Sequence, residues 1–302
     1  MTDPVRVRSM FARIAKSYDL LNAVLSLGID RRWRRALLAR AGDVEGRTIV
    51  DSCCGTGDVA IVFAQAGARV VGVDFTPEML ARAAEKGQKP RRKPVFVHGD
   101  ALSLPVASGI ADACTVAFGI RNVADRRACL REMSRVVRPG GQVLVLEFTM
   151  PPGAVLQALY RFYFTRVLPT IGRMVSKDGD AYSYLPRTVL AWPSPGEFQR
   201  EMEEEGLVEC GHTLLSRGIA CIHWGRTTSV ASASTARARL TSTPSTSTPE
   251  SSTPERNTPE SNTALRPNAA TSSAPPPARG SLDGPATARA LEPASPEKVR
   301  AT

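Results

Sequence analysis

The sequence predicts an α/β fold built on a doubly wound, mostly parallel sheet, and three observations support this prediction. Short apolar runs alternate with helix-period stretches between residues 48 and 148, as in parallel strands joined by helices. The run ending at Asp51 leads into Gly55-Thr56-Gly57 and then into an apolar helix, which is how nucleotide-binding units begin. Two C-terminal apolar runs, 207–214 and 219–224, are separated by a tight turn and indicate an antiparallel edge strand.

The remaining elements follow from the same periodicities. Further strands are expected over residues 48–53, 69–74, 95–98, 111–118 and 142–148. Helices are expected over 57–66, 77–88, 125–137, 154–175 and 195–205, and Arg138-Pro-Gly-Gly141 is expected to form a turn. Residues 5–40 follow helical spacing with a break at Gly28. This helical arm, residues 1–44, is expected to fold over the ligand crevice as a lid, or only to pack on the sheet.

The spacing of acidic residues around the glycine turn narrows the choice of ligand. Asp74 closes the second apolar run, 19 residues after Gly55, where a carboxylate can accept both hydroxyls of a ribose. The helix follows Gly57 at once, without the third glycine that packing beside a pyrophosphate requires. The pattern therefore favours S-adenosylmethionine over a nicotinamide dinucleotide. A tight turn in a ligand-free fold is the remaining alternative.

A third acidic residue extends this site. Asp100 follows the predicted strand 95–98, so its carboxylate can accept the exocyclic amine of an adenine while the N–H of Ala101 serves a ring nitrogen. Ligands of parallel sheets bind at the carboxyl ends of the strands. Asp51, Asp74, Asp100, the segment 118–122 and Glu147 are therefore expected at one rim of the sheet.

Composition divides the chain of 302 residues near residue 226. Residues 227–302 contain no Phe, Trp, Tyr, Ile, Met or Cys, and Thr-Pro recurs there every five residues. Such a segment cannot bury enough apolar surface to offset its conformational entropy, so a disordered tail is expected after a folded domain of residues 1–226.

The net charge and the cysteines limit which binding partners and which cellular compartment are expected. The net charge is +10, partly from Arg31, Arg32, Arg34 and Arg35, which suits nucleic acid, anionic lipid, an anionic ligand or only a solvated surface. No nucleic-acid-binding module is recognisable, so nucleic acid is not expected. The six cysteines lack metal or redox spacing, no secretory signal precedes them, and no stretch reaches the about 18 apolar residues of a membrane span. A cytoplasmic protein is expected.

One predicted helix has two further interpretations. The segment 154–175 has a wide apolar face with Arg161, Arg166 and Arg173 between or after the apolar positions. It can line an apolar substrate pocket or lie on an anionic membrane surface, or it is simply a core helix with solvated arginines.

Several motifs in residues 5–226 resemble the quinone C-methyltransferases of menaquinone and ubiquinone biosynthesis. In chain order these motifs are Val7-x-x-Met-Phe-x-x-Ile-Ala-x-x-Tyr-Asp-x-x-Asn22, Ser26-x-Gly28, Arg32-Trp33, Phe118-Gly-Ile-Arg-Asn-Val123, Met133-x-Arg-Val-Val-x-Pro-Gly-Gly141, Leu146-Glu-Phe148, Tyr184-Leu-Pro-x-Thr188 and Gly218-Ile-Ala-x-x-His-Trp-Gly225. The resemblance implies a Rossmann-like class I fold and S-adenosylmethionine as cofactor. It also implies a lipid quinol as substrate.

The resemblance carries site residues with it. It implies cofactor contacts at Thr56, at Asp74 and at Asp100 with Ala101, beside Asp51, Gly55 and Gly57 of the glycine turn. Ala117 stands where the family usually has serine, so only a backbone contact to the cofactor is expected there.

The chemistry requires groups that stabilise a phenolate, because a quinol ring carbon becomes nucleophilic when the neighbouring hydroxyl loses or shares its proton. Arg121 and Asn122 are the candidates to hold that oxygen, and the alternative for Arg121 is an ion pair with Asp125. Tyr18 is the candidate to relay a proton through water, and Asp19 to orient Arg121. No metal is required.

The substrate is expected to be demethylmenaquinol. The polyprenyl methoxy-benzoquinol of ubiquinone biosynthesis is the alternative, as is a different small-molecule acceptor. A non-catalytic scaffold role in a quinone-synthesis complex is also left open. Peripheral contact with the inner face of the membrane and a homodimer are open as well.

Overall fold

The architecture is taken from a computed structural model that describes residues 3–16, 18–26, 28–88, 90, 92–163, 166 and 179–228. The predicted disordered tail lies outside the described residues from 229 onward, as does most of the predicted helix after residue 163.

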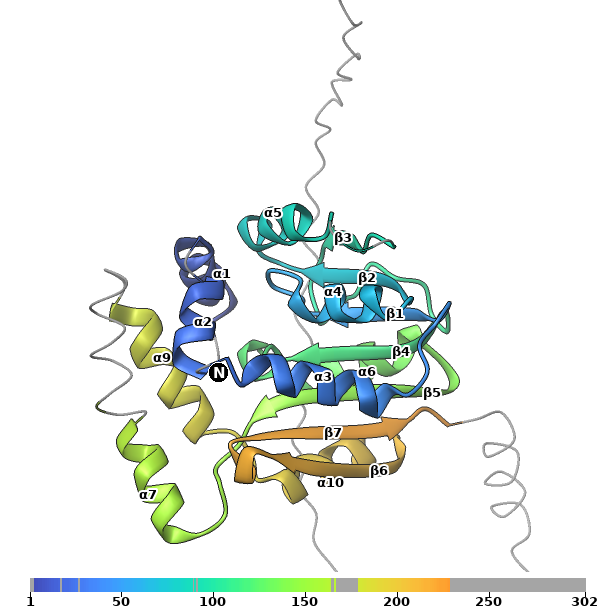
Figure 1. Ribbon diagram of the computed structural model, residues 1–302. Coiled ribbons are helices and arrows are strands. Elements are labelled where there is room, and N and C mark those ends of the chain that lie inside the picture. The colour runs from blue at the N-terminus through green and yellow to red at the C-terminus, as the bar shows by residue number, and fades with distance from the viewer. Residues whose placement is uncertain are drawn as a thin grey trace, which may run out of the picture. The chain divides into compact units, whose positions relative to one another are not determined.

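A twisted sheet of seven strands forms the centre of the described part of the chain (Figure 1). Its strands are β1 (Thr48–Ser52), β2 (Arg69–Asp74), β3 (Val95–His98), β4 (Ala111–Ala117), β5 (Val137–Phe148), β6 (Val208–Leu215) and β7 (Ala220–Arg226). They lie in the order β3-β2-β1-β4-β5-β7-β6. The first five strands pair in parallel, and β7 is antiparallel to both β5 and β6. The predicted doubly wound sheet with an antiparallel edge is confirmed.

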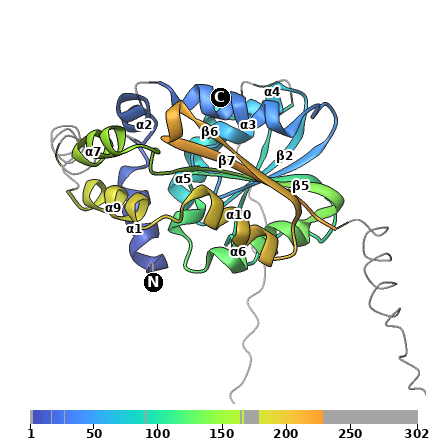
Figure 2. The same cartoon turned by 90° about the horizontal axis from the view of Figure 1, so that it is seen from below.

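Helices cover both faces of this sheet (Figure 2). One face carries α3 (Asp30–Ala41) and α4 (Asp58–Gln65), whose buried Leu37 and Phe63 pack over Ile49 of β1. The other face carries α6 (Arg126–Val136) and α10 (Pro195–Glu204), which bury Met133 and Phe198. The helix α5 (Pro77–Lys86) packs on β2 and β3. These two apolar layers hold the central strands, and therefore the strand ends, in a fixed register.

The N-terminal arm lies at the end of the sheet where the parallel strands finish (Figure 1). α1 (Pro4–Ile14) and α2 (Tyr18–Ser26) lie there together with α7 (Ala154–Phe162) and α9 (Gly179–Leu190), whereas α3, the last helix of the arm, runs along one face of the sheet. Asp3 caps α1 by accepting from the backbone N–H of Val5 at 3.0 Å. The sequence predicts one helix before Gly28, whereas the structure turns at residues 15 and 16 and starts α2 at Tyr18.

The predicted turn at residues 138–141 is instead a bulge inside β5. The pairing of β4 with β5 jumps from Ala111–Val137 to Ala113–Gln142. Gly140 has φ of 77°, and a Cβ on Gly141 would lie 2.7 Å from the carbonyl oxygen of Asp112. The two glycines therefore let the strand fold out and rejoin the sheet, which a residue-by-residue turn assignment cannot anticipate.

No helix in the described ranges is both long enough and apolar enough to span a bilayer.

Candidate active site

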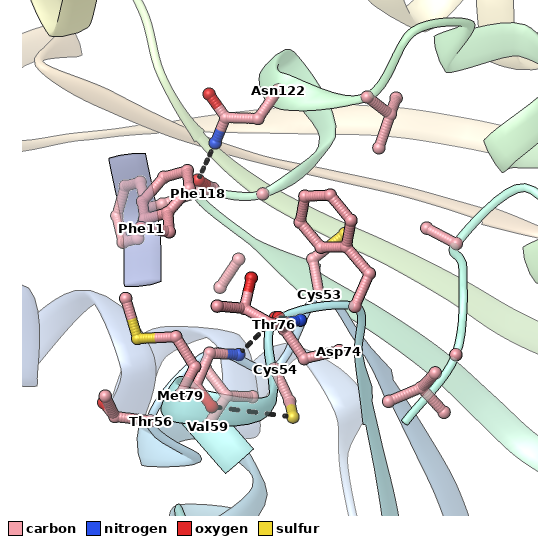
Figure 3. A pocket seen from close by; sticks show the side chains of 18 of the residues that line it. Phe11, Cys53, Cys54, Thr56, Val59, Asp74, Thr76, Met79, Phe118 and Asn122 are labelled. Atoms are coloured by element: carbon pink, nitrogen blue, oxygen red, sulfur yellow. Dashed lines mark hydrogen bonds between the residues drawn. The ribbon is translucent and has the colours of Figure 1, made fainter. Parts of the chain in front are cut away.

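A cavity opens where β1, β2 and β4 end, and the arm closes its outer side. The strand-end segments contribute residues 53–56, 73–76, 99–102 and 117–119, and the turn after β4 contributes residues 122–124. Phe11, Tyr18, Asn22 and Arg34 come from the arm. Figure 3 shows Asn122 on one side of this pocket and Thr56, Val59 and Met79 on the opposite side. The arm therefore contributes part of the cavity wall.

The glycine turn between β1 and α4 uses left-handed backbone at Cys53, Gly55 and Gly57, with φ of 53°, 54° and 80°. Gly55 lines the cavity, and a Cβ there would have no atom within 4 Å. Gly57 does not line the cavity. A Cβ on Gly57 would lie 2.7 Å from the ring of Phe96 in β3. Gly55 is thus open to a ligand, whereas Gly57 permits close packing against β3.

Asp74 is the buried acid of the cavity. The N–H of Gly55 donates to its Oδ2 at 2.8 Å, and the N–H of Thr76 donates to its Oδ1 at 2.9 Å. Burial raises the pKa of the Asp74 carboxyl, and these backbone donors oppose the rise. Each oxygen keeps further lone pairs, so the carboxylate can accept ribose hydroxyls without losing its hold on the turn.

Asp51 has a different place from the one expected, because it does not line the cavity. Its Oδ1 accepts from Thr115 Oγ1 at 2.9 Å and its Oδ2 accepts from the N–H of Ala60 at 3.1 Å. Burial raises the pKa of the Asp51 carboxyl to about 7. The structure makes Asp51 a buried brace between β1, β4 and α4 rather than a ligand-facing group.

Three further residues that were expected to contact the cofactor lie in the cavity wall. Asp100, Ala101 and Ala117 all line it. The Oδ1 of Asp100 accepts from the N–H of Leu102 at 2.9 Å, which fixes the carboxylate at the start of its loop. Ala117 brings no hydroxyl to the wall.

The turn after β4 forms the opposite wall. Phe118 has φ of 56°, a conformation that costs energy for a residue with a side chain. A Cβ on Gly119 would lie 2.4 Å from the Cβ of Cys53, so glycine is required where the two strand ends approach. Asn122 lines the cavity and donates from Nδ2 to the carbonyl oxygen of Phe118 at 3.3 Å. Its buried Oδ1 has no partner in the described structure, which makes it available to a ligand donor.

Arg121 is not among the residues that line this cavity. Its Nη1 donates to Glu147 Oε1 and to the carbonyl oxygen of Phe118, both at 2.6 Å. The guanidinium also lies 5.3 Å from the ring centroid of Phe148, and it borders a second cavity together with Tyr184. The expected partners were Asp125 or Asp19, but the structure gives Glu147 this role.

Tyr18 does line the cavity. Burial raises the pKa of its hydroxyl, while a hydrogen bond with the side chain of Asn22 and the charge of Arg121 act in the opposite direction. The phenol therefore keeps its proton at neutral pH and can donate a hydrogen bond to a ligand oxygen. Asp19, the next residue, turns to the glycine loop and accepts from Thr56 Oγ1 at 2.5 Å.

The structure adds wall residues that the sequence did not single out. They are Phe11, Asn22, Arg34, Cys53 and Met79. Phe11 and Asn22 do stand in the N-terminal motif, but a motif does not say which side of a helix faces a ligand. Phe118 lines the cavity as expected of the rim, whereas Glu147, also expected at the rim, is not among the residues that line it.

Comparison with known proteins bears directly on this geometry. The model of the ubiE/COQ5 methyltransferase family matches residues 2–227. The chain belongs to the ubiE/COQ5 methyltransferase family. The ubiquinone/menaquinone biosynthesis C-methyltransferase UbiE of Syntrophotalea carbinolica is 46% identical over 220 residues, which cover 72% of this chain and 92% of that protein. The demethylmenaquinone methyltransferase of Thermus thermophilus is 44% identical over 218 residues, covering 72% and 99% of the two chains.

A solved structure supports the fold independently. An SAM-dependent methyltransferase of Thermotoga maritima superposes with a TM-score of 0.53 at 19% identity, covering 73% of this chain and 99% of that one. The predicted class of the chain is confirmed: it is an S-adenosylmethionine-dependent C-methyltransferase of quinone biosynthesis. The cavity fits this cofactor, since it offers a buried carboxylate, an open glycine and a polar far end.

Proposed function

We propose that the protein methylates a ring carbon of demethylmenaquinol to give menaquinol. The observation that supports it most directly is that Asn122 and Tyr18 line the same cavity as Asp74, so polar groups suited to a quinol oxygen stand beside the cofactor site. Demethylmenaquinone methyltransferases are among its relatives at 44% and 45% identity. The polyprenyl methoxy-benzoquinol of ubiquinone biosynthesis remains the alternative acceptor, because the relative at 46% identity is named for both pathways.

The cofactor contacts follow from the wall residues. The carboxylate of Asp74 accepts the ribose hydroxyls, and Gly55 and Thr56 bound the site beside it. Asp100 and the N–H of Ala101 receive the adenine, and Ala117 contributes only backbone. Asp51 and Gly57 support this site from behind the cavity wall.

Bound S-adenosylmethionine supplies an electrophilic methyl group, and the chain must make the quinol ring nucleophilic. Asn122 and Tyr18 hold the quinol oxygen. Tyr18 relays the proton of that hydroxyl to water, and its own hydroxyl then donates a hydrogen bond to the phenolate. After methyl transfer, which leaves S-adenosylhomocysteine, the ring proton at the methylated carbon also passes to water and the phenol is restored. Arg121 does not line the cavity, so it stabilises the phenolate through its positive charge and not by contact with the quinol. Removal of water by the arm strengthens these interactions, since the site then has a lower effective dielectric constant.

The decisive experiment supplies the acceptor. Purified protein is incubated with methyl-labelled S-adenosylmethionine and, in separate reactions, demethylmenaquinol or the ubiquinone precursor. Label in the menaquinone product supports the proposal, and label only in the ubiquinone-pathway product contradicts it. Cofactor binding without transfer to either lipid favours the scaffold role. Chromatography of the same sample reports whether the protein is a homodimer.

A lipid substrate requires access to a membrane, and α7 offers a surface for it. Val155, Leu159 and Phe162 recur along this helix and are 86%, 64% and 56% exposed. Arg161 lies among them, as expected of a helix on an anionic surface. Docking of α7 at the cytoplasmic face of the membrane would place the protein beside its substrate.

Flotation with vesicles tests this docking. The double variant Leu159→Glu with Phe162→Glu is expected to lose binding to vesicles that contain anionic lipid. The matched control is the double variant Val95→Glu with Ile110→Glu, which places the same charge on apolar residues that are 59% and 51% exposed elsewhere on the molecule. Equal binding by both variants would exclude α7 as the docking face.

A further inference from the structure

Two side chains of opposite charge line the cavity beyond the glycine turn. Arg34 comes from α3 of the arm and Asp58 is the first residue of α4. Arg34 Nη2 lies 2.9 Å from Asp58 Oδ2, with side chains 12% and 28% exposed. Asp74, assigned above to the ribose, accepts a hydrogen bond from the N–H of Gly55. Thr56 and Asp58 follow Gly55 closely in the chain. The part of the cavity past the ribose position is therefore bounded by Thr56, Asp58 and Arg34.

The amino-acid end of S-adenosylmethionine is a zwitterion, with a carboxylate and an ammonium on one carbon. We propose that Arg34 binds this carboxylate and Asp58 binds this ammonium. The inference rests on the cofactor assigned above and adds the recognition of its methionyl end. A charged pair of this kind matches the zwitterion, which an apolar wall would leave without partners.

The geometry of Arg34 leaves donors for a ligand. The guanidinium meets Asp30 at 2.7 Å and Asp58 at 2.9 Å, and both contacts use Nη2. A guanidinium has five N–H donors arranged as a fork that a carboxylate can accept from bidentately. The Nε and Nη1 side of Arg34 thus remains for the ligand carboxylate, while the two aspartates hold the side chain in position.

The surrounding charges also suit the ligand. Lys86 Nζ lies 2.5 Å from Asp58 Oδ1 and 2.8 Å from Asp19 Oδ2. Together with Asp30 and Arg34, the cluster contains three carboxylates and two cations, so it carries an excess of negative charge. S-adenosylmethionine carries a net positive charge because its sulfonium adds to a neutral zwitterion. The cluster therefore favours the ligand overall and not only its two end groups.

The position of the pair links cofactor binding to the arm. Arg34 belongs to the arm, whereas Asp58 and Thr56 belong to the glycine turn and α4. Asp19 of α2 already bridges to this turn through Thr56 Oγ1 and Lys86. A zwitterion held between Arg34 and Asp58 would add a second connection, so its binding stabilises the covered state of the cavity.

The test compares two ligands that share the adenosine part. S-adenosylhomocysteine has the amino-acid end, and 5′-methylthioadenosine lacks it. By titration calorimetry, Arg34→Gln is expected to weaken S-adenosylhomocysteine binding between about tenfold and a hundredfold. Binding of 5′-methylthioadenosine should change by less than about twofold. Arg32→Gln, on an exposed position of the same helix, is the matched control and should alter neither affinity.

Asp58→Asn separates the two halves of the zwitterion. It should weaken S-adenosylhomocysteine more than an analogue without the amino group, whereas Arg34→Gln should weaken both of these ligands. Thermal unfolding of each variant shows whether the cavity is intact. The inference is overturned if Arg34→Gln weakens 5′-methylthioadenosine as much as S-adenosylhomocysteine, or weakens neither. A wild-type protein that binds neither ligand would instead refute the cofactor assignment itself.

Discussion

The guanidinium of Arg121 lies 2.6 Å from the carboxylate of Glu147, and the two side chains are only 7% and 1% exposed. Burial raises the pKa of Glu147, and the charge of Arg121 opposes that rise. A buried pair at the end of β5 and the turn after β4 ties these two segments together. It sets the position of the turn that presents Asn122 to the cavity.

Arg121→Ala should destabilise the protein as well as stop methyl transfer. Removing one partner leaves Glu147 as an uncompensated buried charge, which costs about 3–5 kcal/mol. The double variant Arg121→Met with Glu147→Gln should regain most of that stability without regaining transfer. Denaturant unfolding and single-turnover rates measure the two effects. Recovered transfer in the double variant would show that Arg121 has only a structural role. Arg127→Ala, which breaks ion pairs at the surface, is the control and should leave the stability nearly unchanged.

Gly119→Ala should damage the cofactor site through Cys53. The new Cβ would lie 2.4 Å from the Cβ of Cys53, and overpacking of this kind costs about 1–3 kcal/mol. Cys53→Gly should rescue the variant, since it removes the clashing atom at a position whose φ is 53°. Calorimetry of S-adenosylhomocysteine binding provides the readout. Gly196→Ala, where a Cβ meets nothing within 4 Å, is the control.

Asp74→Ala should weaken both S-adenosylhomocysteine and 5′-methylthioadenosine, because both ligands carry the ribose. A lost hydrogen bond to a charged group predicts a weakening of about tenfold or more for each. Asp112→Ala serves as the comparison, because Asp112 also accepts from a backbone N–H, that of Thr48 at 2.8 Å, but lies outside the cavity wall. Unchanged ribose-ligand affinity in Asp74→Ala would mean that the ribose binds elsewhere.

A chain that ends after Thr228 should keep full stability and activity, whereas a chain that ends after Arg226 should lose some stability. Thr227 bonds to the bulge of β5: its N–H donates to Gly141 O at 3.1 Å, and its Oγ1 donates to Arg138 O at 2.7 Å. Loss of these bonds predicts a cost of about 1–2 kcal/mol. Urea unfolding of both truncations measures the difference. If the chain that ends after Thr228 is unfolded, the proposed boundary of the methyltransferase domain is wrong.

His223 should make the fold sensitive to acid. Burial lowers the pKa of this imidazole from 6.5 to about 4 in the folded chain. Between those values the unfolded chain binds more protons, so the free energy of unfolding decreases as the pH falls through this window. His223→Gln should flatten that decrease when unfolding is measured from pH 7 to pH 4.

Local sequence patterns were sufficient to predict the sheet and the acidic residues at the carboxyl ends of its strands. Strand and helix periods depend on residues near one another, and the carboxyl ends of parallel strands meet at one edge whatever the details of packing. Asp74, Asp100 and Ala101 therefore reach the cavity as expected. The break between α1 and α2 and the bulge in β5 were not predicted, because both depend on packing against distant segments.

The sequence by itself determined the fold class, the family and which strand ends border the cavity. Only the tertiary structure decided which way individual side chains turn at those ends. It directs Asp51 to Thr115 and Ala60, Arg121 to Glu147, and Asp19 to Thr56. The physical reason is that a buried charge or polar group must find a partner, and that partner is set by close packing between segments remote in sequence.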